Sequence, residues 1–311
     1  MWVSYLEWEQ VDFSSAEAFT QAIGTMLDNI QSIGATVVLA QVRPFGDALY
    51  PSGYFPFSHL CTGTQGQDPG FDPLALLVDA AHARDLQLEA WVNPYRIQAG
   101  QTPALCGASP ARLHPDWVRY TDTGAYLDPA NADVRQYIAD GVGELCARYA
   151  VDGIHFDDYF YPTDDESIDA EQYAAYVNET EEPLTLHEWR TANVNALIAA
   201  VYSRVKEANE NVQFGISPQG NLENNEMINA DVYTWCAQAG YIDYVCPQLY
   251  YSFENEALPF ETALQNWCAL KRLPSIKLYI GLAVYKAGTD ADNGTWSVSY
   301  THLRAHETPE H

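Results

Sequence analysis

The chain has few basic residues. Only 15 Lys and Arg stand against 42 Asp and Glu in 311 residues, which gives a formal net charge of −27. Nucleic acids and anionic membrane surfaces are recognised through basic patches. The charge balance therefore argues against both as partners and permits neutral or cationic ones.

Paired cysteines and long apolar runs are also missing. None of the six cysteines forms a CxxC pair, so a zinc or thioredoxin-type motif is not indicated. Buried free thiols are expected; a disulfide between Cys61 and Cys106, which would need an oxidising compartment, is the alternative. No stretch approaches the ~20 apolar residues of a membrane span, and residue 1 opens no signal peptide.

Metal-binding patterns are equally scarce. The acidic run at 164–171 lacks the DxDxDG order of a calcium loop, so a solvated surface is the better interpretation. We therefore assign no metal ligand and no cofactor. Aromatic residues, in contrast, make up 13% of the chain, with 21 Tyr and 8 Trp. Their flat faces and polar tips suit a sugar-binding cleft, although a large aromatic core would use them too.

Strand-like and helix-like segments alternate along the chain. The expected strands are 1–8, 35–42, 86–92, the start of 151–162, 212–217, 241–246 and 277–284. Helical spacing follows most of them, from Ser14 or Ser15 as N-cap, from Asp72-Pro73, and at 132–149, 185–209, 231–239 and 259–273. Strands that are apolar on both faces and alternate with helices predict a parallel α/β fold.

The fold class that fits is a (β/α)8 TIM barrel. No Gly-x-Gly-x-x-Gly follows the first strand, which argues against a dinucleotide-binding sheet. The long loops follow strands, as they do at the C-terminal face of a barrel of ~250 residues or more. An eighth strand is not visible, so we expect one barrel domain at 1–297 that lacks its last helix and strand. Residues 298–311 are expected to be a non-native or disordered tail, with a natural polar tail as the alternative.

The segment VDGIHFDDYFYP at 151–162 ends a strand in two carboxylates. Because side chains alternate along a strand, His155, Asp157 and Tyr159 share one face. The same alternation at the other strand ends gathers acids, amides, a cation and aromatic rings at the barrel mouth. Its members are Glu7, Arg43, Trp91, Asn93, Asp157, Tyr159, Gln248, Tyr250 and Tyr285. This inventory is typical of a glycosidase cleft, in which two carboxylates do the chemistry and rings stack on sugars.

These strand ends carry a family resemblance. The segments YLEW, QVRPFGDALYPS, WVNPYR, DGIHFDDYFYP, FGISPQGN, CPQLYYS and YIGLAVYKAG resemble the glycosyl hydrolase-like 10 family from residue 1 to about residue 290. The resemblance implies a (β/α)8-barrel glycosidase of the cell envelope or the extracellular space, and some members are linked to cleavage of peptidoglycan glycan strands. It places Asp157 and Asp158 at the catalytic centre. Around the sugar it places Arg43, Asp47, Asn93, Arg96 and Gln248.

The residues that we assign divide into two groups. The catalytic candidates are Asp157, Asp158 and Glu7. The substrate-binding candidates are Arg43, Asp47, Trp91, Asn93, Arg96, Tyr159, Gln248 and Tyr250.

Each assignment has a structural alternative. Asp158 could bond local backbone, Glu7 could pair with Arg43, and Asp47 could fix the loop after the second strand. Asn93 and Gln248 could satisfy buried backbone. His155 is expected to be a core histidine bonded to a neighbouring strand rather than a catalytic base.

The predicted function is hydrolysis of a bacterial polysaccharide, such as the glycan strands of peptidoglycan, by carboxylate acid/base catalysis. A non-catalytic carbohydrate-binding barrel is the alternative. A metal-dependent aldolase or isomerase is a weaker hypothesis. It would need His and carboxylate ligands at several strand ends, and only His155 qualifies. The expected partner is a polysaccharide or oligosaccharide, and the sequence does not indicate an oligomeric state.

Overall fold

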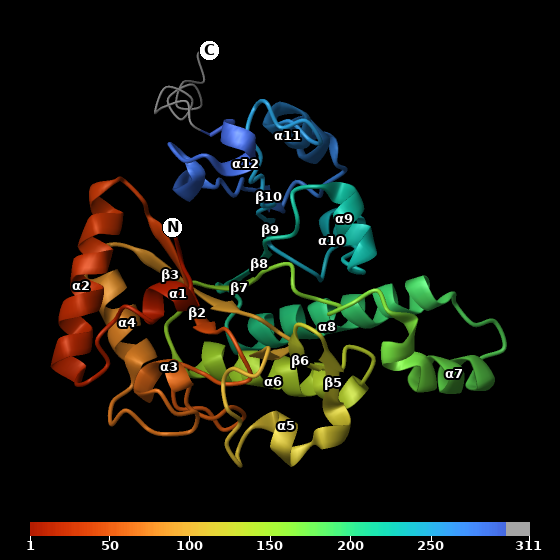
Figure 1. Cartoon of the computed structure of the whole chain (residues 1–311), viewed down its shortest axis with the longest axis horizontal. Coiled ribbons are helices and arrows are strands. Elements are labelled where there is room, and N and C mark those ends of the chain that lie inside the picture. The colour runs from red at the N-terminus through yellow and green to blue at the C-terminus, as the bar shows by residue number, and fades with distance from the viewer. Residues whose placement is uncertain (297–311) are drawn as a thin grey trace.

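The computed structural model describes residues 1–296, so the predictions for residue 297 and for the tail at 298–311 lie outside it. Its centre is a curled sheet in which seven strands run parallel (Figure 1). In spatial order they are β1 (Trp2–Val3), β2 (Val37–Arg43), β3 (Gln87–Val92), β7 (Gly153–Phe156), β8 (Gln213–Ile216), β9 (Tyr244–Val245) and β10 (Lys277–Leu278).

The sheet has the strand order of a (β/α)8 barrel and does not close over the described residues, 1–296. Each strand of this sheet pairs with the strands next to it in the order given above. Within residues 1–296, the first strand, β1, pairs only with β2, and the last strand, β10, pairs only with β9, so the two edges do not meet. The predicted parallel α/β architecture, open at one side, is therefore confirmed for the described residues.

The helices begin where capping side chains predict. Ser15 accepts the Ala18 amide at the start of α2 (Ala16–Ser32), and Asp72 accepts the Ala75 amide ahead of Pro73 in α4 (Pro73–His82). A side-chain oxygen at each N-cap satisfies an amide that has no partner inside the helix. The remaining crossover helices are α6 (Ala132–Arg148), α8 (Leu186–Ala208), α10 (Val232–Ala237) and α11 (Phe260–Ala269).

Apolar residues of the strands and helices form one core. The β2 residues Val38, Ala40 and Val42 are buried and share their cluster with Ile138 and Val142 of α6. In Figure 1, α2 lies beside α4 and α6 beside α8 on the outside of the sheet. Burial of aliphatic side chains on this outer face stabilises the sheet by roughly 1.5–3 kcal/mol per large residue.

The prediction of a single strand over 1–8 was wrong. The strand β1 stops at Val3, and Tyr5–Trp8 form the short helix α1. Ser4 and Glu7 form a capping box in which the Glu7 carboxylate accepts the Ser4 amide at 2.7 Å. The pattern Ser-x-x-Glu is a known start signal for a helix, and it ends the strand here.

A second sheet was also missed. The long loop expected after β3 contains the antiparallel strands β4 (Arg96–Ala99), β5 (Val118–Thr121) and β6 (Gly124–Leu127), with β6 in the middle. It carries the short helices α5 (Pro110–Leu113) and η1 (Pro115–Trp117). Because the loop follows the C-terminal end of β3, this sheet places Arg96 at the mouth of the barrel.

The expected acidic excursion after β7 has its own helices, η2 (Glu166–Asp169) and α7 (Ala170–Glu179). It is tied to the barrel by Asp169, whose two carboxylate oxygens accept hydrogen bonds from Arg190 of α8 at 2.7 and 3.0 Å. Further short elements are α3 (His59–Thr62), α9 (Leu222–Met227), η3 (Val284–Lys286) and α12 (Ala291–Gly294). Among residues 1–296, no helix combines the length and hydrophobicity needed to cross a lipid bilayer.

Candidate active site

Asp157 lies immediately after β7 and is almost completely buried, with 4% of its surface exposed. Its Oδ2 accepts hydrogen bonds from Asn93 Nδ2 at 2.6 Å and from Trp91 Nε1 at 3.2 Å. Its Oδ1 accepts the Tyr159 amide at 3.2 Å. Trp91 and Asn93 come from the end of the neighbouring strand β3, so adjacent strands together fix this carboxylate.

Asp158, the next residue, is half-buried and is held from the opposite side of β7. Its Oδ1 accepts a hydrogen bond from Gln248 Nε2 at 2.9 Å, and the same nitrogen donates to the Ser217 carbonyl at 2.8 Å. Ser217 follows β8 and Gln248 follows β9. The two carboxylates therefore diverge along the rim, one toward β3 and the other toward β8 and β9.

Burial makes both carboxyl groups poor acids. Burial, reinforced by the negative charge of Asp158, raises the pKa of Asp157 to about 7, while the positive charge of Arg96 acts in the opposite direction. Burial also raises the pKa of Asp158, and the hydrogen bond from Gln248 limits this rise. A carboxyl group whose pKa lies near 7 can donate a proton at neutral pH, and a neighbouring ionised carboxylate can act as the base.

An amide network supports Asp157 from below. Gln41 Nε2 donates to Asn93 Oδ1 at 2.5 Å, and Gln41 Oε1 accepts the Tyr5 amide at 2.8 Å. Asn93 can therefore only present its Nδ2 to Asp157, which fixes the direction of that hydrogen bond. Gln41 was not assigned a role from the sequence. Its signal in the sequence is strand alternation, which places Gln41 on the same face as Arg43, and the structure pairs Gln41 of β2 with Trp91 of β3.

Arg96 lies beside the carboxylates within a group of aromatic rings. Its guanidinium carbon is 4.8 Å from the ring centre of Phe45, 5.3 Å from that of Tyr159 and 5.5 Å from that of Tyr5. Tyr159 is 50% exposed, so one ring of this group can meet a ligand. Burial raises the pKa of Tyr250, and the negative charges of Asp157 and Asp158 contribute to the rise.

The structure thus brings together eight of the residues assigned from the sequence. They are Trp91, Asn93, Arg96, Asp157, Asp158, Tyr159, Gln248 and Tyr250. The other three lie elsewhere.

Glu7 does not take the position that strand alternation gave it. It lies on α1, is exposed, and accepts hydrogen bonds from the amide and the hydroxyl group of Ser4. Glu7 does not pair with Arg43 either. Among the hydrogen bonds and ion pairs of residues 1–296, none joins a carboxylate oxygen of Glu7 to the guanidinium of Arg43. The assignment of Glu7 as second carboxylate is not supported by this geometry.

Arg43 is turned away from the mouth. The pairing of β2 with β3 shifts register between Gln41 and Arg43, so that Arg43 pairs with Val92 on the helix-facing side. The guanidinium lies 4.1 Å from the ring centre of Phe55 and is 1% exposed. A bulge of one residue reverses the face of every side chain after it, which strand alternation in the sequence cannot reveal.

Asp47 is fully buried and serves the loop after β2. Its Oδ2 contacts His59 Nδ1 at 3.2 Å and accepts a hydrogen bond from Gln65 Nε2 at 3.1 Å. The ring of His59 packs on Phe45 at 5.4 Å, and Phe45 in turn packs on Arg96. The alternative role of Asp47, to fix this loop, agrees with these contacts.

A buried polar chain lies inside the barrel below the two carboxylates. Tyr244 donates its hydroxyl hydrogen to Glu89, and His155 Nδ1 lies 2.7 Å from the same hydroxyl oxygen. Burial raises the pKa of Glu89 to about 7 and lowers the pKa of His155 to about 3. His155 is therefore neutral and bonded to another strand, as expected for a core histidine.

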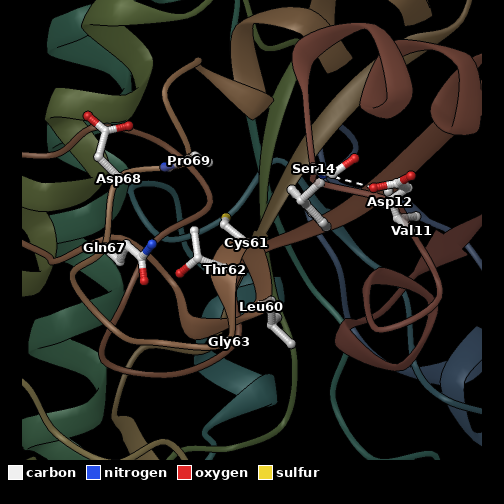
Figure 2. A pocket seen from close by; sticks show the side chains of 11 residues that line it. Val11, Asp12, Ser14, Leu60, Cys61, Thr62, Gly63, Gln67, Asp68 and Pro69 are labelled. Atoms are coloured by element: carbon white, nitrogen blue, oxygen red, sulfur yellow. Dashed lines mark hydrogen bonds between the residues drawn. The ribbon is translucent and has the colours of Figure 1, made fainter.

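Other features of residues 1–296 stand apart from this site. A hollow of about 470 Å³ between 11–14 and 60–69 is lined by none of the assigned residues (Figure 2). Cys61 lines it, but burial raises the pKa of this thiol. All six cysteines are free, so the Cys61–Cys106 disulfide does not form. The described residues hold no group of three or more His, Cys, Asp or Glu that is placed to bind a metal.

Comparisons with known proteins identify the family of this chain. The family model described as Glycosyl hydrolase-like 10 matches residues 1–298. Glycosyl hydrolase YngK of Bacillus subtilis (strain 168) is 34% identical over 320 residues, which cover 96% of this chain and 62% of the relative. Glycosyl hydrolase DigH of Escherichia coli (strain K12) is also 34% identical, over 92% of this chain and 72% of the relative. The chain thus spans less than two thirds of the length of YngK.

Among solved structures, the PgaB (BpsB) glycoside hydrolase domain from Bordetella bronchiseptica matches with a TM-score of 0.60 at 13% identity. The match covers 88% of this chain and 91% of that one, and it shows a shared barrel fold. Because the family model spans nearly the whole chain and two relatives exceed 30% identity, the chain belongs to the glycosyl hydrolase-like 10 family.

Proposed function

We propose that this chain is a glycoside hydrolase that cleaves a bacterial polysaccharide, such as the glycan strands of peptidoglycan, with Asp157 and Asp158 as its catalytic pair. The observation that carries the proposal is the pair itself. Two adjacent carboxyl groups with raised pKa values sit at the C-terminal end of β7, beside the amides of Asn93 and Gln248 and the exposed ring of Tyr159. The family supports a glycosidase-like function.

In this proposal Asp157 is the acid. Its pKa of about 7 leaves a large share of the molecules protonated at neutral pH. Its two oxygens offer about four lone-pair positions and accept three hydrogen bonds, so one position remains for the transferable proton. As the bond between the anomeric carbon and the leaving oxygen breaks, this proton moves to that oxygen.

Asp158 is the second carboxylate. It is less buried than Asp157 and is stabilised as an anion by the amide of Gln248. From there it can take a proton from the water that attacks the anomeric carbon, or attack that carbon itself. Gln248 is fixed by the Ser217 carbonyl, which holds the carboxylate in one orientation.

The test is digestion of a panel of purified bacterial glycans, including peptidoglycan glycan strands freed of their peptides, with product analysis by mass spectrometry. New reducing ends produced by the wild-type protein and not by Asp157→Asn would support the proposal. Saturable binding without any cleavage would instead identify a carbohydrate-binding barrel. We also propose a location at the cell envelope or outside the cell, which fractionation of the source cells can test.

A further inference from the structure

Arg96 is held rigidly at the mouth of the barrel. It opens β4, is 9% exposed, and donates from Nε to the Pro44 carbonyl at 2.8 Å. The rings of Tyr5, Phe45 and Tyr159 surround its guanidinium. Such packing stabilises a partly desolvated cation and fixes the plane of its hydrogen-bond donors.

The two terminal nitrogens of this guanidinium have no hydrogen-bond or ion-pair partner among residues 1–296. Among the ion pairs of residues 1–296, none includes Arg96, and its only side-chain hydrogen bond there leaves from Nε. The terminal nitrogens of Arg43 are fully enclosed by protein and have no hydrogen-bond partner. Those of Arg96 are not enclosed in this way. They therefore keep contact with solvent at the mouth.

A comparison with Arg190 shows what is missing. That arginine is similarly buried, and it binds the two oxygens of Asp169 through Nε and Nη2. A carboxylate suits a guanidinium in this way because the planar fork of donors matches its two oxygens. At Arg96 the position of that carboxylate is left to a ligand.

The ligand's place is next to the reacting groups. The positive charge of Arg96 opposes the rise in the pKa of Asp157, although no Asp157 oxygen comes within ion-pair distance of it. An anion bound to Arg96 would cancel this effect and make Asp157 hold its proton more firmly. The binding of such a ligand would thus prepare the acid for catalysis.

We propose that Arg96 is a specificity residue that binds a carboxylate carried by the sugar at the cleavage site. The proposal rests on the proposed glycosidase function and adds the charge class of the substrate. Two kinds of acidic sugar offer this chemistry. One is a uronic acid, with the carboxylate at C6 of the ring, and the other carries a carboxylate on an ether substituent. A net charge of −27 would repel either one at long range, so Arg96 supplies the local attraction.

The experiment uses matched pairs of oligosaccharides, each with its carboxylate intact or reduced to the alcohol, in a uronic acid series and an ether-linked series. The kcat/KM ratio of acid to alcohol is measured for the wild-type protein, Arg96→Gln, Arg96→Lys and Arg112→Gln. The exposed Arg112 of α5 is the matched control, since its variant loses the same charge. The ratio cancels any general loss of activity or folded protein.

The expected ratio in the wild-type protein is at least about tenfold in one series, in keeping with a charged, bidentate hydrogen bond. It falls to near one in Arg96→Gln, falls severalfold in Arg96→Lys, and stays unchanged in Arg112→Gln. A wild-type ratio near one in both series would overturn the proposal. If Arg96→Gln does not fold, Arg96→Lys decides, and a ratio equal to that of the wild-type protein would then overturn the proposal.

The inference and the proposed function can fail separately. If no sugar is cleaved, the hydrolase proposal fails, and calorimetric binding of the same pairs then decides the role of Arg96. Preferential binding of the acid that depends on Arg96 supports the inference, and equal binding of acid and alcohol rejects it.

Discussion

A carboxyl group as buried as Asp157 costs stability whenever it is charged. Its pKa of about 7 lies well above the ordinary value of 3.8, because burial and the neighbouring Asp158 both disfavour the anion. The native state therefore keeps a proton that the unfolded chain has already released between about pH 4 and pH 7. The stability that this proton contributes is present at acidic pH and is lost as the pH rises through 7.

This linkage predicts the behaviour of Asp157→Asn. The free energy of unfolding of the variant minus that of the wild-type protein should increase by on the order of 2–4 kcal/mol from pH 4 to pH 8. Denaturant titrations at several pH values measure it. Glu89→Gln is the matched control, since the pKa of Glu89 is also about 7: it should show the same sign of change but leave catalysis in place. A difference that does not vary with pH would contradict the raised pKa of Asp157.

The role of Glu7 in helix capping, rather than in catalysis, can be tested by mutation. Its carboxylate completes the capping box of α1 and faces solvent. Replacement by Ala should lower the free energy of unfolding by roughly 0.5–1 kcal/mol and leave kcat/KM unchanged. Thermal unfolding and glycan turnover measured on the same preparation check both parts. A loss of turnover in a folded Glu7→Ala protein would restore Glu7 as a catalytic candidate.

At the scale of elements, the barrel interior depends on a glycine of β8. A Cβ added to Gly215 would lie 2.0–2.2 Å from ring atoms of Tyr244, the residue that joins Glu89 to His155. Gly215→Ala should therefore displace that ring and lower the free energy of unfolding by about 1–3 kcal/mol. Gly143→Ala is the control. A Cβ at Gly143 would meet its nearest neighbour at an ordinary contact distance of 3.7 Å, and alanine has a higher helix propensity than glycine in α6.

The two glycine variants should differ in their free energy of unfolding. Gly143→Ala should be neutral or stabilising in the same denaturant titration. Equal stability of Gly215→Ala and the wild-type protein would show that Tyr244 can move without cost.

The excursion formed by η2 and α7 depends on the buried pair of Asp169 and Arg190. Asp169→Asn would leave the Arg190 guanidinium without its counter-ion in a site that is 5% exposed or less. We expect a loss of about 3 kcal/mol, or local release of the excursion, seen as faster hydrogen exchange over 166–179. Asp164→Asn, whose side chain is exposed on the same excursion, should change neither. Unchanged exchange and stability in Asp169→Asn would contradict the role of the pair.

For the whole molecule, the alternation of strands and helices was readable because its signals are local. Apolar strands and the caps at Ser15 and Asp72 mark boundaries within a few residues. From these the parallel barrel follows, and the carboxylates after β7 reach the mouth as predicted.

The failures have physical reasons of two kinds. The capping box of Ser4 and Glu7 was a local signal that outweighed the apolar character of residues 1–8. The reversal of Arg43 was not local, because the bulge exists only in the pairing of β2 with β3. The loop-fixing contacts of Asp47 are likewise non-local, because His59 on α3 and Gln65 lie 12 and 18 residues further along the chain.

The central claim is that the carboxyl pair after β7 breaks a glycosidic bond. It is tested most directly by the rate of glycan cleavage by folded Asp157→Asn and Asp158→Asn proteins relative to Glu89→Gln, with near-ultraviolet circular dichroism to confirm folding. We predict a fall of at least about 100-fold in kcat for each of the first two, as expected for loss of a general acid or base, and less than about threefold for Glu89→Gln. Cleavage by Asp157→Asn at the wild-type rate would contradict the account.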